Sequence, residues 1–197
     1  MKKYSVDKPH KPYKYFEKAI DLDLYDELIK EIQLNREKIP VTYSDQPILE
    51  RRETAWQTNT NISAKYSGKI MHPVPFTPLV LKVKQEVEKI IGITFDSVLI
   101  FHYVDASDSM GYHFDTEGVS LGDDIVGVTF GSSRKLGIRN NETNEKEFFN
   151  VGNGDIFYMF GDCQKKYKHA IFPADSSIEN PHPRLALTFR NMNIEKS

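Results

Sequence analysis

Two residues near the middle of the chain, His113 and Asp115, have the types and the spacing of a metal-binding pair. They are two positions apart, and residues i and i+2 of a β-strand point to the same face. A pair of this kind can share a metal ion, or it can simply be hydrogen-bonded or solvated. Among the other histidines, His169 is the best third ligand, because it lies in a predicted strand, YKHAIF. Two histidines and one carboxylate leave coordination positions open, which suits Fe(II).

A second pattern lies in the segment RLALTFR, which contains Arg184 and Arg190. The two arginines are six positions apart, so on a strand both point to the same face, together with Ala186 and Thr188. Burying two guanidinium groups costs free energy unless they meet anions. A dicarboxylate cosubstrate would supply two carboxylates, which arginine binds through paired hydrogen bonds. Arginines that bridge acidic residues on the surface would produce the same pattern.

The whole chain limits the class of protein to which these residues can belong. It has 197 residues, 39% of them hydrophobic, which suffices for one domain with a sizeable core. The net charge of −2 gives no overall sign of a nucleic-acid-binding protein. One cysteine, Cys163, excludes an intramolecular disulfide and favours a reducing compartment. No stretch is long and apolar enough for a membrane span or a secretory signal. We therefore expect an intracellular protein, cytoplasmic or nuclear.

The first half of the chain contains two helical patterns. Residues 23–34 carry apolar side chains near helical spacing, and Asp21 or Asp23 could cap that helix. Residues 78–91 give the stronger prediction, because proline suits the first helical position and Gly92 suits the end.

Beyond Gly92 the pattern changes to short β-rich runs separated by turn residues. The runs cover residues 97–104, 125–130, 134–139, 146–151, 155–160, 167–172 and 184–191. So many short strands in so short a segment indicate a double-sheet jelly roll or a sandwich. We expect an α+β fold, a double-stranded β-helix (jelly roll) with the N-terminal helices packed on one face.

Several ordered motifs between residues 51 and 192 resemble the AlkB-like branch of the Fe(II)/2-oxoglutarate dioxygenases. The motifs are RETAW, YSG, FDSVLIFHYVDASDSMGYHFDTE, FGSSRKLGIR, GDIFYMFGDCQKKYKHAIFP and HPRLALTFRNM. The resemblance implies one AlkB-like dioxygenase domain over residues 1–197. The five lysines among residues 1–15 suggest that this part is a flexible basic arm.

The resemblance also implies roles for single residues at the metal and the cosubstrate. The three candidate ligands, His113, Asp115 and His169, match the family's iron ligands. Arg184 matches the arginine that holds the distal carboxylate of 2-oxoglutarate, and Tyr103 matches a tyrosine that helps it. Arg190 matches a second arginine near the metal and the C1 carboxylate.

Two positions depart from the family pattern. Phe101 and Ala186 stand where the family usually has asparagines that line the cosubstrate pocket. Losing both amides makes the pocket more apolar. His102 or Thr188 could supply a replacement polar group.

Residues for the substrate are implied in the same way. Trp56 and Glu117 fall where family members stack on, and hydrogen-bond to, the target base, although Trp56 could equally be a core residue. Tyr66, with Tyr43 and Lys65, could belong to a substrate lid, and a structural or solvated role is the alternative for each.

The activity that the resemblance implies is oxidative demethylation of N-alkylated bases in DNA or RNA, with Fe(II), 2-oxoglutarate and O2. Phosphate contacts could come from Arg134 and Lys135, for which structural or solvated roles are again the alternative. Hydroxylation of a protein side chain or a small metabolite is a second reading, which the acidic pI and the two lost asparagines favour. A binding module without turnover is a third, against which the complete ligand set and both arginines argue. We expect a monomer that acts on alkylated nucleic acid and does not associate with membranes.

Overall fold

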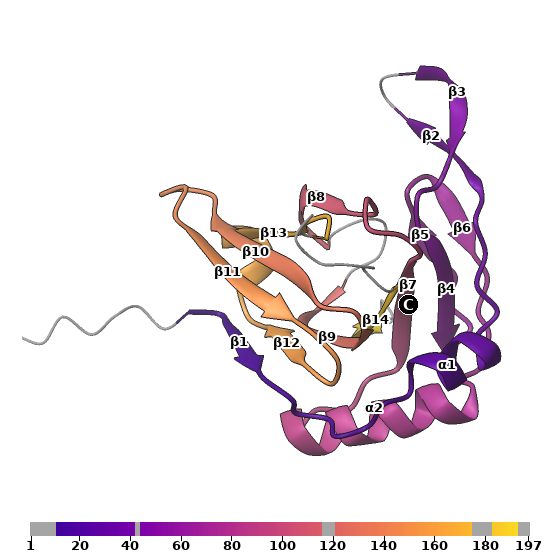
Figure 1. Cartoon of the computed structure of the whole chain (residues 1–197), viewed down its shortest axis with the longest axis horizontal. Helices are drawn as coiled ribbons and strands as arrows, with labels where there is room; N and C mark the ends of the chain where they lie inside the picture. Colours follow the sequence, from indigo (N-terminus) through magenta and orange to yellow (C-terminus); the bar gives the residue numbers. More distant parts are fainter. Residues whose placement is uncertain (1–10, 42–43, 116–120, 175–182, 193–197) are drawn as a thin grey trace, which may run out of the picture.

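Two antiparallel sheets and two hairpins make up most of the computed structural model, which describes residues 11–41, 44–115, 121–174 and 183–192 (Figure 1). The elements in chain order are β1 (Tyr13–Phe16), α1 (Tyr25–Glu31), β2 (Lys38–Val41), β3 (Ser44–Leu49), β4 (Glu53–Thr58), β5 (Ala64–Tyr66), β6 (Lys69–Met71), α2 (Pro78–Ile91), β7 (Ser97–Tyr103), β8 (Met110–His113), β9 (Leu121–Gly131), β10 (Arg134–Asn140), β11 (Lys146–Val151), β12 (Ile156–Met159), α3 (Cys163–Lys166), β13 (Tyr167–Ile171) and β14 (Arg184–Met192).

The major sheet has six strands in the order β1-β12-β9-β14-β7-β4, and the minor sheet has four in the order β11-β10-β13-β8. The strand pairs in both sheets are antiparallel, and β14 lies between β9 and β7, far from both in sequence. The pairs β2–β3 and β5–β6 are separate hairpins. This mostly antiparallel double sheet is consistent with the predicted jelly roll.

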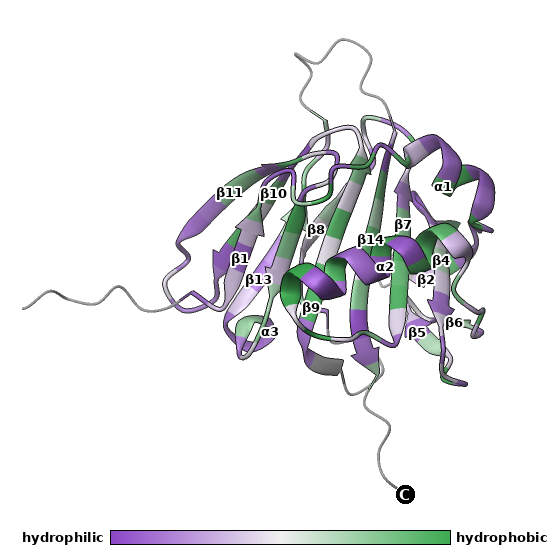
Figure 2. Cartoon of the chain, turned by 90° about the horizontal axis from the view of Figure 1, so that it is seen from below, coloured by the Kyte–Doolittle hydropathy of each residue, from purple (hydrophilic) through white to green (hydrophobic). Residues whose placement is uncertain are grey.

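Strand β14 shows how the two faces of the major sheet are used. Leu185, Leu187 and Phe189 belong to a buried cluster that also contains residues of α1 and α2. Ala186, which points the other way, belongs to a second cluster with side chains of the minor sheet. In Figure 2, α2 lies across β9, β14 and β7. The face of β14 that carries Arg184 and Arg190 is therefore the face between the two sheets.

The predicted helices are observed, with one correction. Residues 78–91 form α2, and Gly92 ends it in the left-handed conformation at φ +80°. The first helix is shorter than predicted and begins after Leu24, so neither candidate aspartate caps it. Instead, Asp26 and Glu27 place acidic side chains in its first turn, where they favour the helix N-terminus. None of the helices that the structure describes is long and apolar enough to cross a membrane.

The seven predicted strands all appear, with ends that differ by up to four residues. Sequence reasoning missed the six strands from β1 to β6. β4 shows why, because its sequence, ETAWQT, lacks an alternating apolar pattern, yet Thr54 and Gln57 are buried. Hydrogen bonds hold such polar groups inside, and composition does not reveal them.

The boundary of the predicted basic arm, at residue 15, is too late. Residues 13–15 belong to β1, which pairs with β12. The ring of Tyr13 stacks on Phe157, and its hydroxyl donates a hydrogen bond to Glu147 at 2.7 Å. These contacts fix the segment to the major sheet, while residues 1–10 lie outside the described part of the chain.

The buried cluster that β14 shares with residues of α1 and α2 should dominate stability. Leu187 is 0% exposed in that cluster, whereas Leu49 on β3 is 54% exposed. Leu187→Ala should lower the free energy of unfolding by about 2–5 kcal/mol in a urea titration, because it leaves a cavity. Leu49→Ala, the matched control, should change it by no more than about 0.5 kcal/mol. Equal losses in the two variants would contradict this assignment of the core.

Candidate metal centre

Three potential metal ligands meet where β8 pairs with β13. His169 of β13 lies opposite His113 of β8, and Asp115 follows two residues after the end of β8. One ligand atom from each of the three side chains lies within 4.8 Å of the others. Asp115 is thus outside the strand that sequence reasoning assumed, but its carboxylate still lies 3.4 Å from Nε2 of His113.

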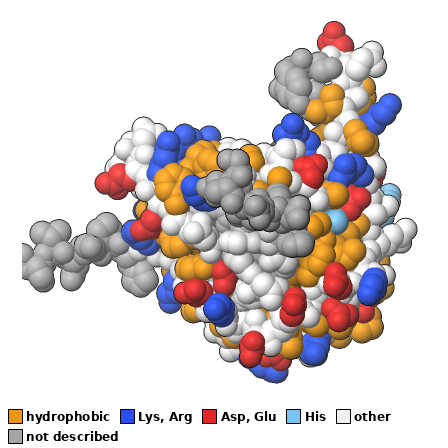
Figure 3. Space-filling view, viewed as in Figure 1, with side chains coloured by type: hydrophobic (Ala, Val, Ile, Leu, Met, Phe, Trp, Pro, Cys, Tyr) orange, Lys and Arg blue, Asp and Glu red, His pale blue; other side chains and the backbone are white. Residues whose placement is uncertain are grey.

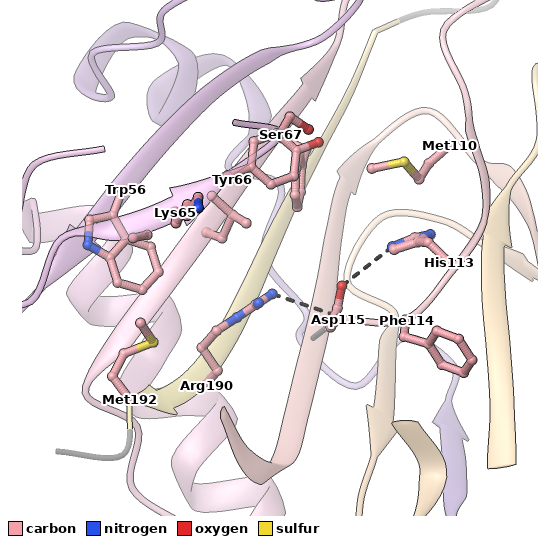
Figure 4. A pocket seen from close by; sticks show the side chains of 13 residues that line it. Trp56, Lys65, Tyr66, Ser67, Met110, His113, Phe114, Asp115, Arg190 and Met192 are labelled. Atoms are coloured by element: carbon pink, nitrogen blue, oxygen red, sulfur yellow. Dashed lines mark ion pairs between the residues drawn. The ribbon is translucent and has the colours of Figure 1, made fainter. Parts of the chain in front are cut away.

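The carboxylate of Asp115 is surrounded by positive and proton-binding groups (Figure 4). Its Oδ2 lies 3.6 Å from Nη2 of Arg190 and 3.8 Å from Nε2 of His169. Burial would raise the pKa of Asp115, but Arg190 and the two histidines hold that pKa well below its usual range. Asp115 is therefore an anion at neutral pH, as a metal ligand must be.

Neighbouring groups fix the orientation of two of the ligands. Nδ1 of His113 lies 2.8 Å from the carbonyl oxygen of Gly111, so it carries the proton and leaves Nε2 free to accept a metal. The backbone N–H of Asp115 donates a hydrogen bond to Oε1 of Gln164 on α3, at 3.0 Å. Sequence reasoning missed Gln164, and no pattern in the chain points to it.

The two histidines differ in their proton affinity. Burial lowers the pKa of His169 to about 4, against the attraction of Asp115. Burial would also lower the pKa of His113, but the hydrogen bond and charge of Asp115 raise it above the ordinary value of 6.5. At neutral pH His169 is therefore a neutral imidazole, whereas a proton still competes with a metal ion for His113.

The donor set fits Fe(II). Two imidazoles and one carboxylate on one side of a site form the facial arrangement of non-haem iron oxygenases, with further positions open. The ring centroids of His113 and His169 are 4.2 Å apart, so both imidazoles border one small space.

A buried guanidinium group, that of Arg184, lies at the start of β14. Its Nη2 donates to Oγ1 of Thr129 at 2.9 Å, and its Cζ lies 4.9 Å from the ring centroid of Tyr103. Within the described residues, Nε and Nη1 of Arg184 and Nε of Arg190 have no hydrogen-bond partner, while Nη2 of Arg190 faces the carboxylate of Asp115. Unpaired buried donors on a cation call for an anion, so this side of the site fits a carboxylate ligand.

A pocket with a volume of about 160 Å³ is lined by two of the three ligands, His113 and Asp115. Much of its lining is aromatic or apolar: Trp56, Ala64, Tyr66, Leu99, Phe101, Met110, Phe114 and Met192 border it, together with Lys65, Ser67, His113, Asp115 and Arg190. Figure 4 shows its labelled side chains around one space, with Trp56 across from His113.

The two predicted substrate aromatics, Trp56 and Tyr66, are fixed walls of this pocket. Trp56 is only 4% exposed, and its indole N–H donates to the carbonyl oxygen of Ile62 at 3.1 Å. The hydroxyl of Tyr66 accepts a hydrogen bond from Arg52 at 3.0 Å, and Arg52 also donates to the carbonyl of Ser109. The sequence motif contained Arg52, but its bridging role could not be read from it.

Several other predicted residues have different outcomes. His102 lies on the opposite face of β7, bonded to Glu53 and Tyr25, so it does not replace a lost asparagine. Arg134 is buried and donates to the carbonyls of Ser133 and Asp105, which favours a structural role over phosphate contact. Tyr43 and Glu117 lie outside the described residues.

Comparison with known proteins gives the family. A family model described as the 2OG-Fe(II) oxygenase superfamily matches residues 13–190. The chain therefore belongs to the 2OG-Fe(II) oxygenase superfamily, and its similarity to alkB-type proteins makes it an AlkB-like member. It is an Fe(II)- and 2-oxoglutarate-dependent dioxygenase, with Fe(II), 2-oxoglutarate and O2 as metal and cosubstrates.

The relatives differ in how much they share with the chain. Protein R406 of Acanthamoeba polyphaga mimivirus is 69% identical over 182 residues, 92% of this chain and 94% of that protein. DNA oxidative demethylase ALKBH2 of Bos taurus is 27% identical, covering 90% of this chain and 66% of the relative. Alpha-ketoglutarate-dependent dioxygenase alkB homolog 3 of Bos taurus is 30% identical over 72% of this chain. The chain spans about half the length of that last relative, 51%.

Among solved structures, that of OsALKBH1 is similar, with a TM-score of 0.66 and 13% sequence identity. The match covers 92% of this chain and 97% of the other. At this identity the likeness concerns the fold alone.

Metal affinity should depend on pH in a defined direction. The pKa of His113 is raised above 6.5, so the affinity for Mn(II), used in place of iron, should fall as the pH drops below that pKa. The loss should approach about tenfold per pH unit, since His113 must lose one proton before it binds the metal. Calorimetric titration from about pH 8 to pH 5 measures it, with His72→Ala, which changes an exposed loop histidine, as control. A flat profile would contradict the assignment.

Proposed function

We propose that the chain is an oxidative demethylase of N-alkylated bases in DNA or RNA. The relatives include a DNA oxidative demethylase, and the chain belongs to the same superfamily of dioxygenases. The observation that carries the proposal is an aromatic pocket of about 160 Å³ directly beside the ligand cluster. Apolar cavities of about this size bind a single six-membered ring. A flipped-out base would place such a ring between Trp56 and the metal.

His113, Asp115 and His169 would hold the iron in this proposal. Bound Fe(II), 2-oxoglutarate and O2 supply hydroxylation of a C–H bond, and an N-methyl group hydroxylated in this way breaks down to formaldehyde and the free base. Asp115 contributes the charge and the histidines the neutral nitrogens. The hydrogen bond from the backbone N–H of Asp115 to Gln164 would fix the backbone at this residue, and so help to hold its carboxylate in place.

The cosubstrate would lie between the two buried arginines. Arg184 would bind the distal carboxylate of 2-oxoglutarate, with Tyr103 beside it, and its unpaired Nε and Nη1 support this role. Arg190 would lie near the C1 carboxylate while it pairs with Asp115. Phe101 lines the pocket where family members carry an amide, so fewer polar groups would hold the ligand.

The proposal extends to the substrate and to the organisation of the chain. Trp56 and Tyr66 would bound the base, and Glu117 would hydrogen-bond to it. We further propose a single AlkB-like domain over residues 1–197, acting as a monomer in the cytoplasm or nucleus. The helices α1 and α2 would form a layer over one face of the major sheet, which their shared cluster with β14 supports.

Formaldehyde release tests the proposal against the alternative of a protein or metabolite hydroxylase. Protein loaded with Fe(II) should release formaldehyde from oligonucleotides that carry one ring-N-methylated base, with one succinate formed for each. Activity should fall by at least about a thousandfold in His113→Ala, because a metal ligand is lost, and stay unchanged in His72→Ala. Succinate without formaldehyde, on every methylated DNA and RNA tested, would overturn the demethylase and leave the hydroxylase.

A further inference from the structure

Three basic side chains form a line across the outer face of the minor sheet. In the strand register, Arg139 of β10 lies opposite Lys146 of β11 on one side and opposite Lys168 of β13 on the other. Ile138 and His169, the sequence neighbours of Arg139 and Lys168, are buried between the sheets, so Arg139 and Lys168 point outward. Lys146 lies directly opposite Arg139 and therefore shares its face. Adjacent strands are about 4.8 Å apart. We call Lys146, Arg139 and Lys168 the basic row.

The basic row is not neutralised by the protein. Like charges directly opposite each other destabilise a sheet. Within the described residues, none of the three forms an ion pair with an acidic side chain, and Nε of Arg139 is buried without a hydrogen-bond partner. This concentration of charge occurs in a chain whose net charge is −2. Its cost would be offset by an anionic ligand outside the chain.

Aromatic rings lie beside the basic row. Phe148, 51% exposed, is opposite Gly137, in the row of residues next to the cations. A Cβ atom at Gly137 would come within 2.8 Å of Phe172 and of the hydroxyl of Tyr112, so glycine makes room for these rings. Figure 3 shows Lys and Arg side chains next to hydrophobic ones at the upper left, near the β10–β11 end of the minor sheet.

The basic row leads to the pocket beside the metal centre. The minor sheet has the order β11-β10-β13-β8, so the row runs towards β8, the strand that carries His113. Nζ of Lys168, the last member, lies 4.8 Å from the ring centroid of Phe114. Phe114 itself lines the pocket. A ligand on the row would therefore be continuous with one in the pocket.

We propose that the outer face of the minor sheet binds a single-stranded polynucleotide, whose phosphates contact Lys146, Arg139 and Lys168 and one of whose bases stacks on Phe148. Cations that follow a backbone, next to an exposed ring, are the elements of single-strand binding. In a duplex, stacked neighbours cover both faces of a base, so the ring of Phe148 could not stack on it. The inference rests on the proposed function, because it supplies the path by which a strand delivers its modified base to the pocket.

Salt-dependent binding tests the proposal. The affinity for a fluorescent single-stranded oligonucleotide without methylated bases is measured by anisotropy over a series of salt concentrations. Each of Lys146→Gln, Arg139→Gln and Lys168→Gln should weaken binding about fivefold at 0.1 M salt and lower the salt slope by about 0.7. Lys82→Gln, the same change at an exposed position on α2, should alter neither. Phe148→Ala should weaken binding and leave the slope unchanged.

The outcomes separate this proposal from the proposed function. Equal affinities in the three variants and Lys82→Gln, with formaldehyde still released from methylated oligonucleotides, would overturn the binding face and leave the demethylase. Poly-glutamate that competes as well as the oligonucleotide would show an acidic protein partner instead. Folding is checked by thermal unfolding, in which Lys146→Gln should be at least as stable as the wild type, because a like charge has been removed, whereas Arg139→Gln and Lys168→Gln also lose contacts with the rings of Tyr112 and Phe114. Lys146, the exposed member, keeps the test valid if another variant misfolds.

Discussion

The ionised carboxylate of Asp115 joins the two sheets. Its oxygens face His113 of β8 and His169 of β13 in the minor sheet, and Arg190 of β14 in the major sheet. A buried carboxylate is stable only where such partners converge, and removing Arg190, the permanent cation among them, would leave its charge uncompensated. The antiparallel register that sets His169 opposite His113 is therefore also a requirement of the electrostatics.

Positive charge is placed on two surfaces of the fold. Between the sheets, Arg190 pairs with Asp115, whereas Arg184 is buried with two nitrogens that have no hydrogen-bond partner among the described residues, which fits an anionic cosubstrate. On the outer face of the minor sheet, the basic row places charge of the same sign along the approach to the pocket. Stability alone would favour acidic side chains next to these cations. In both places an anionic ligand would instead neutralise the positive charge.

Sequence reasoning found the parts of the molecule that follow from local pattern. Alternation along β14 predicted that Arg184 and Arg190 share a face, and β8 and β13 do bring His113 and His169 together. It could not find Gln164, whose amide reaches Asp115 across 49 positions. Strands β1 and β4, and the alignment of Arg139 with Lys168, depend on pairing between distant segments, which composition does not encode.

A crystal structure grown without O2, with Mn(II) and 2-oxoglutarate, would test the central claim most directly. It should show one metal bound by Nε2 of His113, Nε2 of His169 and a carboxylate oxygen of Asp115. The carboxylate oxygens of Asp115 already lie 3.4 Å from Nε2 of His113 and 3.8 Å from Nε2 of His169. The distal carboxylate of 2-oxoglutarate should meet Arg184. Metal bound elsewhere, or 2-oxoglutarate with no contact to Arg184, would contradict the account.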